Sequence, residues 1–175
     1  MKKLFLTRHC EAHNFEEGVD DYKKKLTEEG IKDAQLLNEW FFDNQIKLDL
    51  IFSSSARRAL DTSNLLFERY KEKIKIKDNL YLCNREQIIK LLKTVEDEVY
   101  DVALVGHEPS ISESLKYLIG SSRPDLENFI NLPYPAGGIS IIYFNIKSWN
   151  ELDESVGVLD ALIDPNYLKS NEKKN

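Results

Sequence analysis

Histidine and arginine side chains gather in three short polar segments of this sequence, each directly after an apolar run. The segments contribute, in chain order, Arg8 with His9, Arg57 with Arg58, and His107. A guanidinium group can bind two phosphoryl oxygens through paired hydrogen bonds, and a neutral imidazole can attack phosphorus or carry a proton. If the segments meet in the fold, they form a compact positive pocket in a protein whose net charge is −6. The residue types therefore predict a site for a phosphoryl group.

The apolar runs before these segments predict strands that end at one edge of a sheet. The runs cover residues 3–7, 48–52 and 101–105. Each is short and leads into a polar turn, which favours a buried strand over a helix. Helices are expected at four places: after Thr27 as the N-cap, from Ser53–Ser55 through about Tyr70, over residues 86–92, and from Ser110 or Ser112 through about Ile119.

Strands that alternate with helices predict an α/β fold, a three-layer sandwich whose central, mostly parallel sheet is flanked by helices. Residues 138–146 are the strongest strand signal, because β-branched and aromatic residues follow a Pro-Ala-Gly turn there. Residues 157–162 are expected to add an edge strand. Ligands of such sheets bind beyond the carboxyl ends of the strands, where the three polar segments would lie.

Length and composition favour one globular domain. The chain has 175 residues, of which 42% are hydrophobic and 31% charged, so it can bury a core without disulfides or a structural metal. We expect a single domain over residues 1–168. Residues 169–175 contain no apolar side chain and are expected to be a disordered tail.

Charge and cysteine content argue against several classes of protein. The acidic excess disfavours general nucleic-acid or membrane binding, since such proteins present Lys and Arg in excess. Cys10 and Cys83 are too few for a disulfide framework, which favours a reducing compartment. The apolar start of the chain is too short for a signal sequence or a membrane span, so a cytoplasmic location is expected.

Five motifs carry a resemblance to a known family. They stand in chain order as Leu6-Thr7-Arg8-His9-Cys10-Glu11-Ala12, Leu26-Thr27-Glu28-Glu29-Gly30, Ser54-Ser55-Ala56-Arg57-Arg58-Ala59-Leu60-Asp61-Thr62, Val105-Gly106-His107-Glu108-Pro109 and Pro135-Ala136-Gly137-Gly138. They resemble the motifs of the histidine phosphatase superfamily, whose hallmark is Arg-His-Gly after the first strand. The resemblance covers nearly the whole chain and looks greatest with bacterial phosphohistidine phosphatases of the SixA type. It implies a phosphoglycerate mutase-like sandwich.

The resemblance also implies a role for each residue of the pocket. His9 would be the nucleophile and would become a transient phosphohistidine that water hydrolyses. Arg8 and Arg58 would hold the non-bridging phosphoryl oxygens, and His107 would donate a hydrogen bond to them. Arg58 is chosen over Arg57 because the family pattern places its arginine directly before an alanine. Neither a metal nor another cofactor is implied.

Two positions depart from the family pattern. Cys10 stands where glycine or alanine is usual, either as a small buried side chain or as an oxidation-sensitive thiol beside the nucleophile. Glu108 stands where asparagine is common. It would be either a general acid beside His107 or a turn or helix-start residue.

The absence of a matching acid motif bears on the expected substrate. Phosphoglycerate mutases of the superfamily carry a general-acid glutamate after the third strand, and residues 81–86 do not match that pattern, although Glu86 stays open as an acid. An imidazole, with a pKa of about 6.5, can leave without a strong acid, whereas an alcohol needs one. The expected activity is therefore metal-independent hydrolysis of phosphohistidine, borne by a signalling or phosphotransfer protein.

Two alternatives stay open. One is a phosphatase or mutase of small phosphate esters in the same superfamily, with Glu108 or Glu86 as the acid and a phosphorylated metabolite as substrate. The other is a non-catalytic module that binds phosphate or a phosphoprotein. Neither a nucleic acid nor a membrane is an expected partner. The acidic residues 16–21 are expected to form a solvated loop, with a bound cation or basic partner as the alternative.

Overall fold

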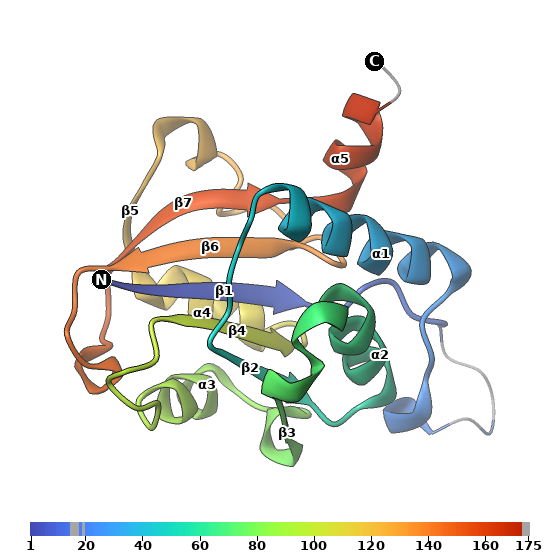
Figure 1. Cartoon of the computed structure of the whole chain (residues 1–175), viewed down its shortest axis with the longest axis horizontal. Coiled ribbons are helices and arrows are strands. Elements are labelled where there is room, and N and C mark those ends of the chain that lie inside the picture. The colour runs from blue at the N-terminus through green and yellow to red at the C-terminus, as the bar shows by residue number, and fades with distance from the viewer. Residues whose placement is uncertain (15–17, 19, 173–175) are drawn as a thin grey trace.

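The computed structural model describes residues 1–14, 18 and 20–172, in which strands and helices alternate (Figure 1). The strands are β1 (Lys2–Arg8), β2 (Leu50–Ser54), β3 (Ile74–Lys77), β4 (Asp101–Gly106), β5 (Ile119–Ser122), β6 (Ile139–Phe144) and β7 (Gly157–Ile163). The α-helices are α1 (Glu28–Asp43), α2 (Arg57–Leu66), α3 (Arg85–Leu92), α4 (Ser110–Leu118) and α5 (Pro165–Glu172). Short 3-10 helices join them, among them η1 (Asp21–Lys23) and η2 (Glu68–Lys73).

The strands form one sheet in the order β3-β2-β4-β1-β6-β7-β5. β3, β2, β4 and β1 are parallel, β6 is antiparallel to both β1 and β7, and β5 is parallel to β7. Because β1, β2 and β4 run the same way, the polar segments that follow them meet at one edge of the sheet. The expected α/β fold with a mostly parallel sheet is confirmed.

Alternation of side chains along the strands divides the core into two parts. Phe5 of β1 packs with α1 and α2 on one face of the sheet, whereas Leu4 and Leu6 pack with α3 and α4 on the other. In Figure 1, α1 and α2 lie in front of the central strands and α4 lies behind them. These two helical layers around one sheet make the predicted three-layer sandwich.

The prediction of an edge strand over residues 157–162 is wrong in its position. β7 lies between β6 and β5, and β5 is the edge strand. β5 begins at Ile119, whose extended backbone ends α4 one residue earlier. A glycine and two serines give the rest of β5 little strand propensity, so the sequence does not reveal the neighbour that covers β7.

The two helices nearest the site differ in how well their starts were predicted. Thr27 caps α1 as expected, because its Oγ1 accepts a hydrogen bond from Gly30 N at 3.0 Å. The serine run does not open α2: Ser53 and Ser54 belong to β2, and α2 begins at Arg57 without a side-chain cap. It ends at Leu66, short of Tyr70, and η2 follows.

The C-terminal helix continues past residue 168, where the domain was expected to end. α5 reaches Glu172, and residues 173–175 lie outside the described residues. Lys169 Nζ lies 2.5 Å from Glu29 Oε1 and 2.6 Å from Asp33 Oδ1 of α1. Residues 169–172 are therefore helical rather than a disordered tail, and Lys169 links this helix to α1.

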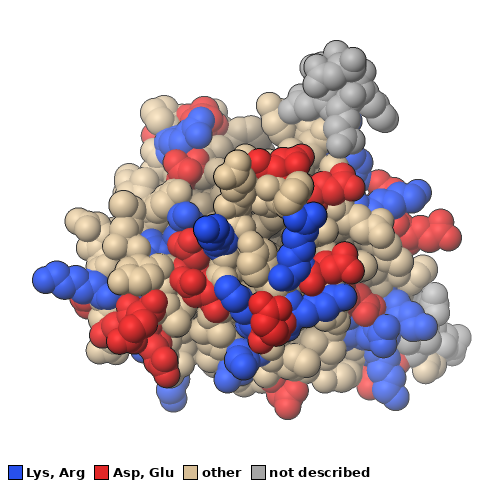
Figure 2. All heavy atoms as spheres, in the orientation of Figure 1, with Lys and Arg blue, Asp and Glu red and all other residues tan. Residues whose placement is uncertain are grey.

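The surface carries charges of both signs. Figure 2 shows Lys and Arg side chains interspersed with Asp and Glu side chains over the face seen there, without a continuous basic stripe on that face. Among the described residues, no helix combines the length and hydrophobicity that crossing a membrane requires.

Gly30 sets how closely α1 approaches the segment after β1. A Cβ atom at Gly30 would lie 2.1 Å from the backbone oxygen of Glu11. Gly30→Ala is therefore expected to lower the free energy of unfolding by ~1–3 kcal/mol, although alanine is the better helix former. Urea denaturation would measure it. Lys32→Ala, at an exposed position of α1, is the control and should change stability by less than ~0.5 kcal/mol. Stabilisation by Gly30→Ala would contradict this close approach.

Candidate active site

His9 follows β1 directly, and two of its nitrogens contact backbone oxygens. Its N–H donates to Gly106 O at 3.1 Å, and its Nδ1 lies 2.7 Å from Cys10 O. A carbonyl oxygen can only accept, so Nδ1 carries the proton and a neutral His9 has a free electron pair on Nε2. Burial lowers the pKa of His9 to about 4. The ring is therefore neutral near pH 7, with Nε2 unprotonated.

Arg58, in the first turn of α2, points at that electron pair. Its Nε donates to His9 Nε2 at 3.2 Å, and the side chain is buried. Thr62, one turn on, donates to Arg58 O at 2.8 Å and accepts from Cys10 N at 3.0 Å, which ties α2 to the end of β1. Arg57 points outward and pairs with Asp61 at 2.9 Å. Of the two neighbouring arginines, the structure brings Arg58 to His9.

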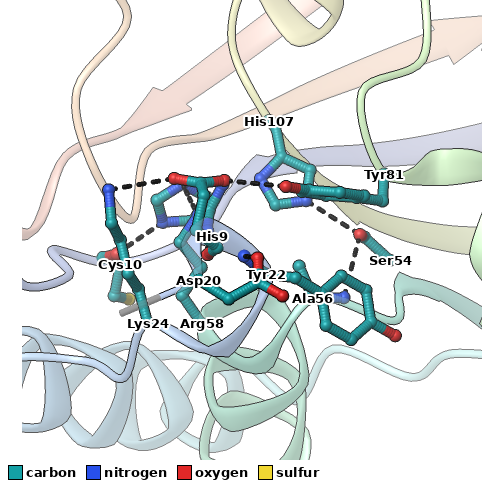
Figure 3. Close-up of polar contacts among 11 residues, drawn as sticks. His9, Cys10, Asp20, Tyr22, Lys24, Ser54, Ala56, Arg58, Tyr81 and His107 are labelled. Atoms are coloured by element: carbon teal, nitrogen blue, oxygen red, sulfur yellow. Dashed lines mark hydrogen bonds and ion pairs between the residues drawn. The ribbon is translucent and has the colours of Figure 1, made fainter. Parts of the chain in front are cut away.

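His107 faces His9 from the end of β4. The two ring centroids lie 5.1 Å apart, and His107 Nε2 is 2.8 Å from Ser54 Oγ of β2 (Figure 3). Burial, with the neighbouring His9 as a second cause, lowers the pKa of His107 to about 3. Its Nδ1 is buried and has no hydrogen-bond partner among the described residues. A buried nitrogen of this kind is free to bind a ligand.

Arg8 completes the group at the end of β1. Its Nη1 donates to Tyr134 O at 2.6 Å, which directs the side chain toward the segment before β6. Its Nε is buried and, like His107 Nδ1, has no partner among the described residues. Two buried nitrogens near His9 thus lack partners, and a buried polar group without one is costly. An oxyanion is the kind of ligand that would satisfy them.

The two departures from the family pattern, Cys10 and Glu108, both have structural roles. Cys10 is fully buried, does not have a positive φ, and burial raises its pKa to about 12, so its thiol is a small core side chain rather than a reactive thiolate. Glu108 Oε1 accepts a hydrogen bond from Ser112 N at 3.0 Å. This is the contact that the helix-start interpretation predicts.

Glu86 does not lie in this group of residues. It is exposed in the first turn of α3, where its Oε1 is 2.5 Å from Nη2 of Arg85. A backbone hydrogen bond, followed by the contact with Arg85, holds the pKa of Glu86 below its usual value. No group of three or more potential metal ligands occurs among the residues that the structure describes.

Asp21 belongs to the site, although no sequence motif indicated it. Its backbone oxygen accepts from Arg58 Nη1 at 2.6 Å, and its Oδ2 accepts from Arg58 Nη2 at 3.0 Å. Tyr81, whose ring lies against His107, donates to the same Oδ2 at 2.9 Å. Of the acidic stretch 16–21, which was expected to be solvated, only residues 18, 20 and 21 are described, and Asp21 faces the site. Asp21 lies 37 residues from Arg58 in the chain, so no local spacing connects them.

Comparisons with known proteins identify similar sequences and structures. The model of the histidine phosphatase superfamily (branch 1) matches residues 4–81. An uncharacterized protein of Mycobacterium leprae (strain TN) is 27% identical over 151 residues, 83% of this chain and 91% of that one. A crystal structure from Agrobacterium tumefaciens, provisionally described as the phosphohistidine phosphatase SixA, is 25% identical with a TM-score of 0.78, over 94% of this chain and 99% of that one.

A second solved structure shares the fold at lower identity. It comes from Escherichia coli K-12 and is provisionally described as an alpha-ribazole-5'-P phosphatase. It is 19% identical to this chain with a TM-score of 0.70, over 94% of this chain and 98% of that one. At this identity the likeness concerns the fold alone.

The two depressed histidine pKa values predict how stability depends on pH. In the unfolded chain an imidazole binds its proton below about pH 6.5, whereas folded His9 and His107 do so only near pH 4 and pH 3. Between those limits the unfolded chain binds more protons, so the free energy of unfolding falls as the pH is lowered through this window. Urea denaturation at pH 7 to 3 would measure it. His107→Gln, which cannot titrate, should show a shallower fall than wild type, and an equally steep fall would contradict the assignment.

Proposed function

Because this chain belongs to the histidine phosphatase superfamily, we propose that it hydrolyses phosphohistidine through a covalent phosphoenzyme on His9. The observation that carries the proposal is the hydrogen bond between His9 Nδ1 and Cys10 O, which leaves the electron pair on Nε2. That pair is the nucleophile that in-line attack on phosphorus needs. Low pKa values keep both histidines neutral at physiological pH, so the nucleophile does not have to lose a proton first.

The reaction proceeds in two steps. The substrate ring is protonated at the nitrogen that does not carry phosphorus. His9 Nε2 forms a bond to phosphorus while the bond from phosphorus to the substrate nitrogen breaks, and the P–N electron pair leaves on that nitrogen, so the leaving group is a neutral imidazole. Water then attacks the phosphoryl group on His9, the P–Nε2 electron pair returns to His9, and inorganic phosphate is released. Arg58 Nε, which donates to Nε2 in the free site, turns to a phosphoryl oxygen when the substrate binds.

Arg8, Arg58 and His107 bind the phosphoryl oxygens in this proposal. The buried Nε of Arg8 and Nδ1 of His107 have no partner among the described residues, so a phosphoryl group supplies acceptors that the protein itself does not. Preorganised donors of this kind stabilise the charge that develops on the equatorial oxygens in the transition state. No step of this mechanism requires a metal or another cofactor.

The leaving group favours phosphohistidine over an ester. Glu108 is engaged at the start of α4 and Glu86 lies outside the group, so neither is held ready to protonate an alcohol. An imidazole leaves without such an acid. The similar structure from Agrobacterium tumefaciens is provisionally described as acting on phosphohistidine. We therefore propose a phosphohistidine-bearing signalling or phosphotransfer protein as the partner. We also propose a cytoplasmic location.

A phosphatase of small esters is the second candidate, and one observation favours it. Glu108 directly follows His107, and its carboxylate would become a general acid if it left Ser112 N. The similar structure from Escherichia coli is provisionally described as an alpha-ribazole-5'-P phosphatase. Under this alternative, Glu108→Gln would lose ester turnover.

Replacement of the nucleophile tests the proposed reaction. Phosphate release would be measured from a phosphohistidine-bearing protein and from 4-nitrophenyl phosphate, with EDTA present. We expect release mainly from phosphohistidine, no effect of EDTA, and a loss of ~10³-fold or more in His9→Ala. An acid-labile phosphoenzyme should form on wild type and not on His9→Ala. Release mainly from the ester would favour the second candidate, and binding of phosphate without release from either substrate would favour a non-catalytic module.

The neighbouring arginines provide a matched pair of variants. Arg58→Ala removes the guanidinium that contacts His9, so kcat/KM is expected to fall ~10²–10³-fold, as for loss of one preorganised oxyanion donor. Arg57→Ala removes the same type of side chain one residue away, where it is exposed and pairs with Asp61. Its kcat/KM should stay within about twofold of wild type. Equal losses in the two variants would refute the assignment of Arg58.

A further inference from the structure

Asp21 lies at the solvent side of the site and is more exposed than Arg58, which binds phosphate in our proposal. Its side chain is 47% exposed, whereas that of Arg58 is 11% exposed. Its carboxylate therefore reaches from solvent to the guanidinium that touches the nucleophile. Tyr81, Arg58 and Lys24 all contact this carboxylate. In the proposed reaction the leaving group departs on the solvent side of the site, where this carboxylate lies.

The carboxylate of Asp21 is an acceptor and not a proton donor. Lys24 Nζ lies 3.0 Å from Oδ1, and Arg58 and Tyr81 donate to Oδ2. These contacts, that of Lys24 foremost, lower the pKa of Asp21 to about 2. At neutral pH it holds no proton to give to an alkoxide. It can accept a further hydrogen bond, because a carboxylate has about four acceptor positions and three donors occupy part of them.

A fixed negative charge beside a phosphate site discriminates between substrates. It repels the dianion of a phosphate ester, which has no positive charge to compensate. A phosphohistidine protonated at the ring nitrogen that does not carry phosphorus has a cationic ring with an N–H donor. The same carboxylate therefore disfavours one class of substrate and can favour the other through a charge-assisted hydrogen bond.

We propose that Asp21 selects phosphohistidine by accepting a hydrogen bond from the ring N–H of the leaving imidazole. This inference rests on the proposed function and assigns its leaving-group specificity to one residue. Asp21 binds the substrate ring in its protonated form. When His9 Nε2 bonds to phosphorus, the P–N electron pair stays on the substrate nitrogen, and the ring leaves as neutral imidazole with its N–H still on Asp21. This step therefore requires no proton from the enzyme.

A purely positional role for Asp21 makes a different prediction. Its backbone oxygen and Oδ2 accept from Nη1 and Nη2 of Arg58, and these contacts hold the guanidinium in place for every substrate. If this were its whole role, loss of the carboxylate would slow hydrolysis of phosphohistidine and of an ester by the same factor. The ratio of the two kcat/KM values therefore separates selection of the leaving group from positioning of Arg58.

The experiment compares wild type with Asp21→Asn, Asp21→Glu and Asp20→Asn. Each protein is assayed with a peptide carrying one phosphohistidine and with 4-nitrophenyl phosphate, after urea denaturation has shown that it is folded. In Asp21→Asn the ratio of kcat/KM for phosphohistidine to that for the ester is expected to fall about tenfold to hundredfold, as for loss of one hydrogen bond to a charged group. Asp21→Glu, which keeps a carboxylate, should retain more of the ratio than Asp21→Asn.

Asp20→Asn is the matched control. It removes the same charge one residue earlier, and asparagine keeps the side-chain acceptor that caps η1 at Tyr22 N. Its ratio should equal that of wild type. If Asp21→Asn leaves the ratio of the two kcat/KM values unchanged, whether or not both values fall, the proposed role of Asp21 is overturned and the proposed function still stands. An equal fall in Asp20→Asn would likewise overturn it, as an effect of loop charge. Wild type that hydrolyses the ester but not phosphohistidine would refute the proposed function, and this inference with it.

Discussion

The hydrogen bond between His9 Nδ1 and Cys10 O is the interaction on which the site depends. It determines which ring nitrogen carries the proton, and therefore that the electron pair of Nε2 faces Arg58. Burial adds a second condition, because burial, together with the positive charges of Arg58 and Arg8, lowers the pKa of His9 and keeps the ring neutral. A solvated imidazole would be protonated over part of the physiological range and would lose its nucleophilic pair.

The scaffold places this ring by contacts between the ends of neighbouring elements. β1 and β4 are parallel, so His9 and His107 leave the sheet side by side, and their rings lie 5.1 Å apart. Thr62 accepts from Cys10 N and donates to Arg58 O, which couples the turn after β1 to the first turn of α2. The site is therefore built on regular elements rather than on loops alone, and its geometry follows from the packing of the sheet.

Electrostatic balance explains how an acidic protein holds a basic pocket. The guanidinium of Arg58 contacts a carboxylate on its outer side and a neutral imidazole on its inner side. Asp21 compensates the arginine in the free protein and remains ionised because Lys24, Tyr81 and Arg58 all donate to it. Asp21, in the segment between β1 and α1 that shows no specificity signal in its sequence, therefore supplies a charge at the solvent side of the site.

The sequence by itself determined the α/β class and the strands that deliver Arg8, His9 and His107. Its resemblance to a family pattern implied the choice of Arg58 over Arg57. Strand patterns, helix patterns and motif spacing involve residues that are close in the chain, so they can be recognised without knowledge of the fold. Only the tertiary structure decided that β7 is an inner strand, that α5 pairs with α1 through Lys169, and that Asp21 and Tyr81 join the site. Asp21 and Tyr81 are 60 residues apart in the chain, and their contact forms only when the chain between them folds. A hydrogen bond of that kind depends on the packing of the whole sheet and leaves no periodic trace in the sequence.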